Sequence, residues 1–248
     1  MCGIVGYVGT KNVPGRAYFA LDVVLEGLRR LEYRGYDSAG VAVLDEGKIS
    51  FRKKAGKVAA LDEVIAADPL PQAVVGIGHT RWATHGGPTD ANAHPHVVDG
   101  GKLAVVHNGI IENFAELKTE LAEKGYTFKS ETDTEVAATL LSDFMHGAGE
   151  GDLTESMRLT CNRLEGAFTL LALHTDFPDR IVAARRNSPL VIGLGEGENF
   201  LGSDVSGFID YTKNAVEMAN DQIVTITATS YDIIDFAGNK AQGKPFKV

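Results

Sequence analysis

The sequence predicts an α+β domain in which strands and helices fall into separate blocks instead of repeating as βαβ units. Two strand-like segments, residues 39–44 and 48–53, are separated only by the turn Asp45-Glu46-Gly47, which indicates a hairpin. Three helical segments then follow one another between residues 113 and 163, and strand-like segments return from residue 167 onward. This order favours antiparallel strands in packed layers over a doubly wound parallel sheet.

The first half of the chain contains a strand, a helix and a long polar stretch. Residues 2–8 are apolar with interspersed glycines, which is typical of a buried strand, and residues 73–79 and 103–107 predict two more. Within residues 17–31, apolar side chains recur on one helical face: Leu21, Val24, Leu25, Leu28 and Leu31. Residues 84–101 are rich in Gly, Pro, Asn and His, and loops of this length are often functional.

The second half begins with helices and ends with strands. The predicted helices are residues 113–124, 133–145 and 153–163. Thr132 followed by Glu135 forms a capping-box pattern at the start of the second of these helices. The predicted strands are residues 167–174, 181–185, 190–194, 223–228 and 232–236. Residues 238–248 are polar, with Gly, Lys, Gln and Pro, and predict a linker or tail.

Composition excludes several classes of protein. The net charge is −9 over 248 residues with no dense basic block, which argues against nucleic acid or an anionic membrane as the main partner. No apolar run reaches about 18 residues, so no membrane span is expected, and Lys11 and Arg16 interrupt any signal peptide. Two cysteines make no disulfide framework. We therefore expect a soluble, cytoplasmic protein.

Cys2 is a candidate nucleophile. If Met1 is removed, Cys2 carries both a thiol and a free α-amine, and that amine titrates near pH ~7.7–8.0, where it can act as the base. The alternative is that Cys2 is simply a small apolar residue entering a strand.

Three further segments are rich in reactive side chains: residues 78–86, 106–109 and 130–135. Asn108-Gly109 is either a hairpin turn or, because a helical segment follows, an oxyanion hole. Asp133 could complement a helix dipole, and Arg81 could stack on Trp82. Five of the seven histidines lie between residues 79 and 107, but they lack zinc-type spacing, so we expect no metal and interpret them as bracing the loop.

Read together, these segments resemble the glutaminase domain of the class II glutamine amidotransferases, which are N-terminal-nucleophile hydrolases. The resemblance rests on residues 25–40, 79–86, 92–96, 107–113 and 130–135, and it extends from Cys2 to about Ile226. Tyr33 and Tyr36-Asp37 favour the hexosamine branch of the family over the amidophosphoribosyltransferases. The segment from Thr10 to Ala20 looks longer than usual.

The resemblance implies a four-layer αββα sandwich and a division of roles. Cys2 would attack the side-chain amide of L-glutamine, Asn108 and Gly109 would hold the oxyanion, Arg81 would bind the α-carboxylate, and Asp133 would bind the α-ammonium. The remaining site residues would line the substrate pocket or gate it towards the acceptor domain: Arg34, Trp82, Thr84 and His85. No cofactor is implied.

The resemblance also implies a domain organisation. Residues 2–237 would form the glutaminase domain, and residues 238–248 would lead to a sugar-phosphate isomerase domain in a homo-oligomeric full-length enzyme. Three alternatives stay open: another class II amidotransferase, a silent glutamine-binding or regulatory module, and a structural scaffold. A glutaminase needs the thiol of Cys2 and the oxyanion pair, whereas a binding module needs only Arg81 and Asp133.

Overall fold

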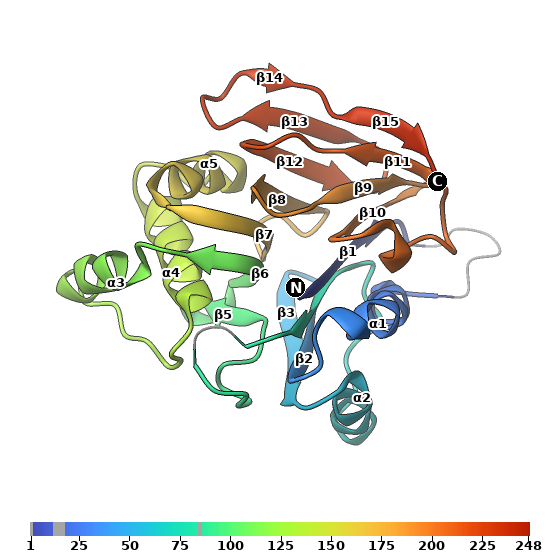
Figure 1. Cartoon of the computed structure of the whole chain (residues 1–248), viewed down its shortest axis with the longest axis horizontal. Helices are drawn as coiled ribbons and strands as arrows, with labels where there is room; N and C mark the ends of the chain where they lie inside the picture. The colour runs from blue at the N-terminus through green and yellow to red at the C-terminus, as the bar shows by residue number, and fades with distance from the viewer. Residues whose placement is uncertain (1, 12–17, 84–85) are drawn as a thin grey trace.

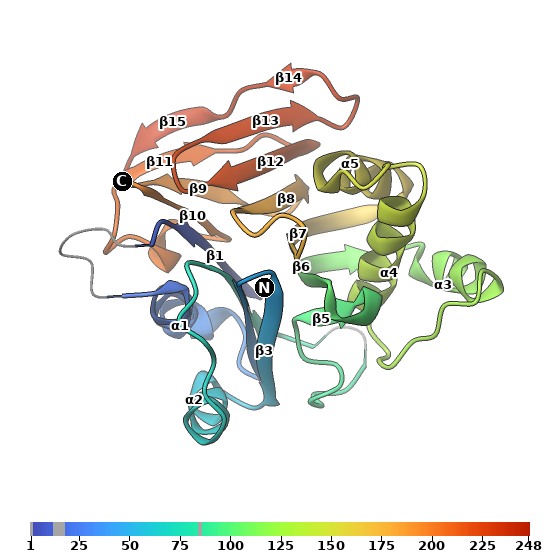
Figure 2. The ribbon, with the colours of Figure 1, turned by 180° about the vertical axis from the view of Figure 1, so that it is seen from behind.

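The computed structural model describes residues 2–11, 18–83 and 86–248, and it consists of two sheets packed face to face between helices (Figures 1 and 2). The first sheet contains β1 (Gly3–Gly9), β2 (Ser38–Asp45), β3 (Lys48–Ala55), β4 (Val75–Arg81), β9 (Val191–Leu194), β10 (Glu198–Gly202), β11 (Asn214–Glu217) and β15 (Lys244–Lys247). The second contains β5 (His96–Val98), β6 (Leu103–Ile111), β7 (Gly166–His174), β8 (Arg180–Arg186), β12 (Gln222–Thr227), β13 (Tyr231–Asp235) and β14 (Lys240–Ala241). The helices are α1 (Ala20–Leu31), α2 (Val58–Ala67), α3 (Phe114–Glu123), α4 (Asp133–His146) and α5 (Leu153–Arg163).

Three apolar layers hold these elements together. One lies between the sheets and includes Ile4 and Ile77 of the first sheet and Leu171 of the second. A second joins α1 and α2 to the outer face of the first sheet, and a third joins α3, α4 and α5 to the outer face of the second. The layer order is therefore αββα, which confirms the expected four-layer sandwich. Among the residues described, no helix has the length and apolar character needed to cross a bilayer.

The N-terminal strand lies in the middle of the first sheet. β1 pairs with β10 on one side and with β4 on the other, with Gly3 opposite Thr80. A Cβ atom on Gly3 would lie 2.6 Å from Thr80 Oγ1 and 2.7 Å from Leu31 Cβ, so the close approach of these elements requires glycine. Cys2 is thereby held beside the end of β4.

Asn108 and Gly109 lie within β6, which continues to Ile111. We expected them at a strand end, and this expectation is wrong: both residues pair with β7, with Asn108 opposite Thr169 and Gly109 opposite Phe168. The hairpin-turn interpretation is excluded by the same pairing.

Most elements match the sequence-based expectations, including the hairpin of β2 and β3 and the helices α3, α4 and α5. The Thr132 side chain accepts a hydrogen bond from the Glu135 amide, as the capping pattern predicted. Residues 238–248, which we expected to be a linker or tail, contain β14 and β15 at the sheet edges. The sequence analysis also missed α2, β5, β10 and β11. α2 buries only Val58 and Leu61, too narrow an apolar face for a clear helical pattern.

Candidate active site

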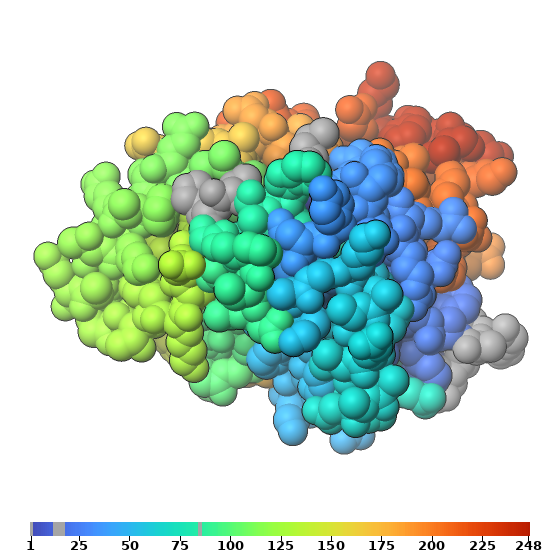
Figure 3. Space-filling view, turned by 60° about the horizontal axis from the view of Figure 1, so that its bottom comes forward, coloured from blue at the N-terminus to red at the C-terminus, as the bar shows by residue number. Residues whose placement is uncertain are grey.

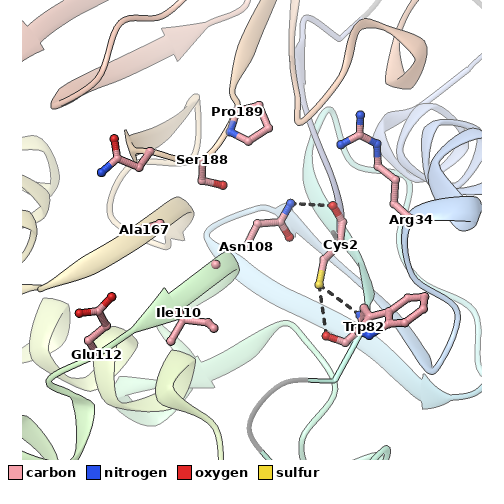
Figure 4. Close-up of a pocket in the computed structure, with 11 residues that line it drawn as sticks. Cys2, Arg34, Trp82, Asn108, Ile110, Glu112, Ala167, Ser188 and Pro189 are labelled. Atoms are coloured by element: carbon pink, nitrogen blue, oxygen red, sulfur yellow. Dashed lines mark hydrogen bonds between the residues drawn. The ribbon is translucent and has the colours of Figure 1, made fainter.

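The Cys2 thiol lies at the entrance to a cavity, against the main chain that follows β4. The Trp82 amide donates a hydrogen bond to Cys2 Sγ at 3.1 Å, and Sγ lies 3.6 Å from the Trp82 carbonyl oxygen (Figure 4). Burial raises the pKa of the Cys2 thiol, while the Trp82 amide and the Arg81 charge act in the opposite direction. Since burial is the larger effect, the thiol needs a base to become a nucleophile.

Asn108 and Gly109 lie directly beside Cys2. Asn108 Nδ2 donates to the Cys2 carbonyl oxygen at 2.8 Å, so the side-chain NH2 group faces the nucleophilic residue (Figure 4). Gly109 has φ +122°, and a Cβ atom there would lie 2.0 Å from the Ala167 carbonyl oxygen. Only glycine fits this conformation and this approach to β7. The two residues are therefore in position to supply donors near Sγ.

A cavity of about 430 Å³ opens next to Cys2 (Figure 4). Five residues predicted from the sequence line it: Cys2, Arg34, Trp82, Asn108 and Gly109. Six lining residues were not predicted: Ile110, Glu112, Ala167, Asn187, Ser188 and Pro189. The first two follow the Asn-Gly pair directly, Ile110 within β6 and Glu112 just after its end, which is a signal that could have found them. The others come from distant parts of the chain and carry no local signal.

Arg34 and Trp82 form the rim of this cavity. Arg34 Nη2 donates to Asp204 at 2.7 Å, and its Nε donates to the Tyr33 hydroxyl at 3.1 Å. Trp82 is 51% exposed, and its ring meets Tyr36 edge-on with 5.5 Å between centroids. Since Arg81 is buried, Trp82 and Arg81 do not form the exposed stacked pair that the sequence left open.

Cys2 also lines a second, much smaller pocket of about 10 Å³, together with Gly109, Arg81 and Asp133 among others. Arg81 donates from Nη1 to the Gly87 carbonyl at 3.1 Å and from Nη2 to the Gly86 carbonyl at 3.2 Å. Asp133 Oδ2 accepts from the Ile111 amide at 2.9 Å. A cation and a carboxylate thus share a pocket with the thiol. Thr84 and His85 lie outside the described residues, as does most of the segment between Thr10 and Ala20.

In Figure 3 the teal surface near the centre belongs to the polar loop that follows β4. Hydrogen bonds anchor this loop on both sides. Towards β3, Lys53 Nζ donates to the Ala91 and Ala93 carbonyls at 3.1 and 2.7 Å. Towards α4, Asn92 Nδ2 donates to Glu131 at 3.0 Å and Asn92 Oδ1 accepts from the Glu131 amide at 3.0 Å. This loop provides the Gly86 and Gly87 carbonyls that hold Arg81, so its anchoring also fixes the guanidinium.

Four buried histidines gather at the small pocket. Three of them, His79, His94 and His107, line it, and His96 packs against His94. Burial lowers the pKa of His79 to about 3 and lowers those of His94 and His96 well below their ordinary value. In the part of the chain that the structure describes, no group of three or more His, Cys, Asp or Glu side chains is placed to hold a metal ion.

The chain has relatives among known proteins. Residues 79–210, just over half of the chain, match the family described as "Glutamine amidotransferase domain". The chain is 77% identical over its whole length to a glutamine–fructose-6-phosphate aminotransferase (isomerizing) of Corynebacterium diphtheriae, and 58% identical to the enzyme of that name in Streptomyces coelicolor. It spans 40% and 39% of the lengths of these relatives.

Solved structures share the fold. The glutamine phosphoribosylpyrophosphate amidotransferase of B. subtilis superimposes with a TM-score of 0.80 at 24% identity, over 96% of this chain and 50% of that one. A glutamine aminotransferase class-II domain protein from silicibacter pomeroyi matches with a TM-score of 0.62 over 95% of this chain and 99% of that one. The family match, the αββα layers and the residues gathered around Cys2 agree. The chain belongs to the family of glutamine amidotransferase domains.

Proposed function

We propose that this domain hydrolyses L-glutamine to glutamate and ammonia through a thioester on Cys2. We propose further that it is the ammonia-supplying half of an enzyme that makes glucosamine 6-phosphate from fructose 6-phosphate. The observation that carries the proposal is that Cys2 lines two pockets, one shared with Asn108 and Gly109 and the other with Arg81 and Asp133. A scaffold protein would have no use for a thiol, two oxyanion donors and two opposite charges in one place.

In the first step the Cys2 thiolate attacks the side-chain amide carbon of glutamine. The C–S bond forms, and the carbonyl oxygen becomes an oxyanion that accepts hydrogen bonds from Asn108 Nδ2 and the Gly109 amide. The tetrahedral intermediate then collapses, the C–N bond breaks, and ammonia leaves after taking up a proton. In the second step water attacks the thioester, and glutamate departs as the Cys2 thiol is restored.

The proton is carried by the α-amine of Cys2, which requires that Met1 be removed. A free α-amine titrates near pH ~7.7–8.0, close to the working pH, so it can take the thiol proton and then give it to the leaving nitrogen. Burial raises the pKa of the Cys2 thiol, which makes such a base necessary.

Arg81 and Asp133 bind the α-carboxylate and the α-ammonium of glutamine. An arginine can make two parallel hydrogen bonds to a carboxylate, which a lysine cannot reproduce. A pocket of about 10 Å³ holds no more than one water molecule, so glutamine must displace side chains there. We infer that the Arg81 guanidinium turns from the Gly86 and Gly87 carbonyls towards the substrate. Thr84 and His85 would complete the pocket.

We propose that the full-length enzyme contains a further domain besides this one. The domain would span residues 2–237 together with the paired strands β14 and β15. Residues 238–248 would then lead on to a sugar-phosphate isomerase domain, because the chain covers only 40% of its relative from C. diphtheriae. Ammonia would leave past Trp82 at the cavity rim, with Arg34 lining the path. We propose that the protein is cytoplasmic, since both cysteines, Cys2 and Cys161, are free. The homo-oligomeric state of the full-length enzyme is proposed from the family resemblance alone.

The proposal is tested by measuring glutamate release from L-glutamine, using protein whose loss of Met1 has been verified by intact mass. Wild-type protein should release glutamate, and Cys2→Ala should release none. Cys2→Ser should be severely impaired, because a hydroxyl is much harder to deprotonate than a thiol. Cys161→Ala, which removes the buried distant thiol, should keep wild-type turnover. If trimmed wild-type protein binds glutamine but releases no glutamate, the domain is a binding module and the proposal fails.

A further inference from the structure

We propose that His79, a residue with no role so far, is a positioning residue that holds the Asn108 amide in its productive orientation. This inference rests on the proposed function, because it concerns the oxyanion donor of that reaction. His79 lines the small pocket with Cys2, Arg81 and Asp133, but the proposed role is exerted through its hydrogen bond to Asn108 and not on the reacting atoms.

The orientation of the Asn108 amide follows from its two neighbours. Nδ2 lies 2.8 Å from the Cys2 carbonyl oxygen, and Oδ1 lies 2.9 Å from His79 Nε2. A main-chain carbonyl can only accept, so the atom facing Cys2 must be the NH2 group, and the oxygen must then face His79. His79 must consequently carry its proton on Nε2 and donate it to Asn108.

The other nitrogen of His79 agrees with this tautomer. Nδ1 is buried and makes no hydrogen bond to any of the described residues. A proton on Nδ1 would therefore be a buried donor without an acceptor, which is costly. Burial lowers the pKa of His79 to about 3, and this effect outweighs the hydrogen bond to Asn108, which acts in the opposite direction. The ring is therefore neutral at working pH.

The His79 ring is held in place by its own neighbours. It stacks on His94 with 4.1 Å between ring centroids and an interplanar angle of 28°. His94 Nδ1 accepts a hydrogen bond from the His107 amide at 3.3 Å, and His107 Nδ1 lies 2.9 Å from Thr134 Oγ1. The stack ties the end of β4 to β6 and to α4, so the N–H of His79 has a fixed direction.

The fixed orientation of the Asn108 amide leaves the second proton of Nδ2 free for the oxyanion. One proton is used on the Cys2 carbonyl, which leaves the other for the oxyanion. Without the His79 donor, Asn108 Oδ1 would be a buried acceptor lacking this partner, and the amide could rotate so that its oxygen faced the developing negative charge. The loss should then approach that of an oxyanion donor, which is about 10²–10³ in rate.

The experiment compares two substitutions in trimmed protein. His79→Gln keeps an N–H donor at a similar reach, while His79→Leu keeps a similar volume without a donor. We expect kcat for glutamate release to fall by about 10- to 100-fold in His79→Leu, with KM within about threefold of wild type, and to be largely retained in His79→Gln. His174→Leu is the matched control, because His174 is another buried histidine but lines neither pocket. Its kcat should not change.

A double-mutant cycle separates positioning from general destabilisation. If His79 acts through Asn108, then adding His79→Leu to Asn108→Ala should lower kcat no further. An additive loss in the double variant, or an unchanged kcat in the single variant, overturns the inference. Should His79→Leu fail to fold, His79→Phe offers the same test, because it keeps a ring for stacking on His94 and has no donor.

The ring tautomer gives a measurement that does not depend on turnover. In wild-type protein the imidazole ¹⁵N signals of His79 should show a proton on Nε2 and no titration between about pH 5 and 8, given the direction of its pKa shift. A proton on Nδ1, or titration near the ordinary value, overturns the inference. A protein that has the Nε2–H tautomer but releases no glutamate would refute the proposed function instead.

Discussion

Replacing Gly109 by alanine tests whether the backbone at the oxyanion site requires glycine. The substitution has two costs that can be worked from the structure. The φ of +122° is a region that L-residues rarely adopt, with a strain of about 1–3 kcal/mol. The added Cβ would lie 2.0 Å from the Ala167 carbonyl oxygen and 2.9 Å from Phe168 Cα, which are backbone atoms of β7 and cannot rotate away. β6 and β7 would have to separate by about 1 Å, and overpacking of this kind costs a further ~1–3 kcal/mol.

Gly125→Ala is the matched control. Gly125 also has a positive φ, +94°, but a Cβ atom there meets nothing within 4 Å. The control should therefore show the strain alone. For a chain of this size, a difference of about 1–3 kcal/mol corresponds to a further fall in Tm of roughly 2–12 °C in Gly109→Ala.

Activity should separate the two variants more sharply. A displacement of about 1 Å at a reacting centre can cost about 10² in rate, so kcat for glutamate release should fall by that order in Gly109→Ala and stay at the wild-type value in Gly125→Ala. Both are measured at a temperature where thermal denaturation shows each protein to be folded. A Gly109→Ala protein with wild-type kcat would refute the reasoning, because catalysis would then not depend on the observed position of the Gly109 backbone amide.

Three further results are expected. Arg81→Lys should raise KM for glutamine by about 10-fold or more, because a lysine cannot make the paired hydrogen bonds to a carboxylate; a wild-type KM would contradict this. Asp133→Asn should raise KM for glutamine much more than it lowers kcat, since the substrate ammonium loses its counter-charge. A lower kcat with an unchanged KM would argue for another role of Asp133. Acid should destabilise the fold, because burial lowers the pKa values of His79, His94 and His96 below their unfolded value of about 6.5. The contribution of these neutral histidines to the free energy of unfolding is complete above pH ~6.5 and is lost as the pH falls towards the folded pKa, because the unfolded chain then binds protons that the folded protein does not. Lowering the pH from 6.5 to 5.5 should therefore reduce the free energy of unfolding, measured in urea, by about 1 kcal/mol per histidine. Equal free energies of unfolding at pH 6.5 and 5.5 would exclude acid destabilisation by these histidines.

The local elements could be predicted wherever a periodic apolar pattern was strong. α1 buries Val24, Leu28 and Leu31 on one face, and the observed α5, residues 153–163, coincides with its predicted range. Thr132 and Glu135 marked the start of α4 because an N-cap needs a side-chain oxygen at that position. β14 and β15 were not predicted, because edge strands bury few side chains and their polar composition resembles that of a linker.

The candidate site was predictable in part of its residues, but neither its geometry nor six of the residues that line the cavity could be predicted. Cys2, Arg81, Asn108, Gly109 and Asp133 stand in motifs that can be identified by residue type and family resemblance. Their roles stay predictions until turnover is measured.

The sequence by itself determined the α+β class, the main helices and strands, and the chemical groups available for catalysis, because these depend on local periodicity and residue type. Only the tertiary structure brought Cys2 to within hydrogen-bond distance of Trp82 and Asn108, which are 80 and 106 residues away in the chain. It also placed Asn108 and Gly109 inside a strand and set His79 behind the Asn108 amide. The physical reason is that sheet register and the packing of buried faces are decided by contacts between distant segments, and no local pattern encodes these contacts.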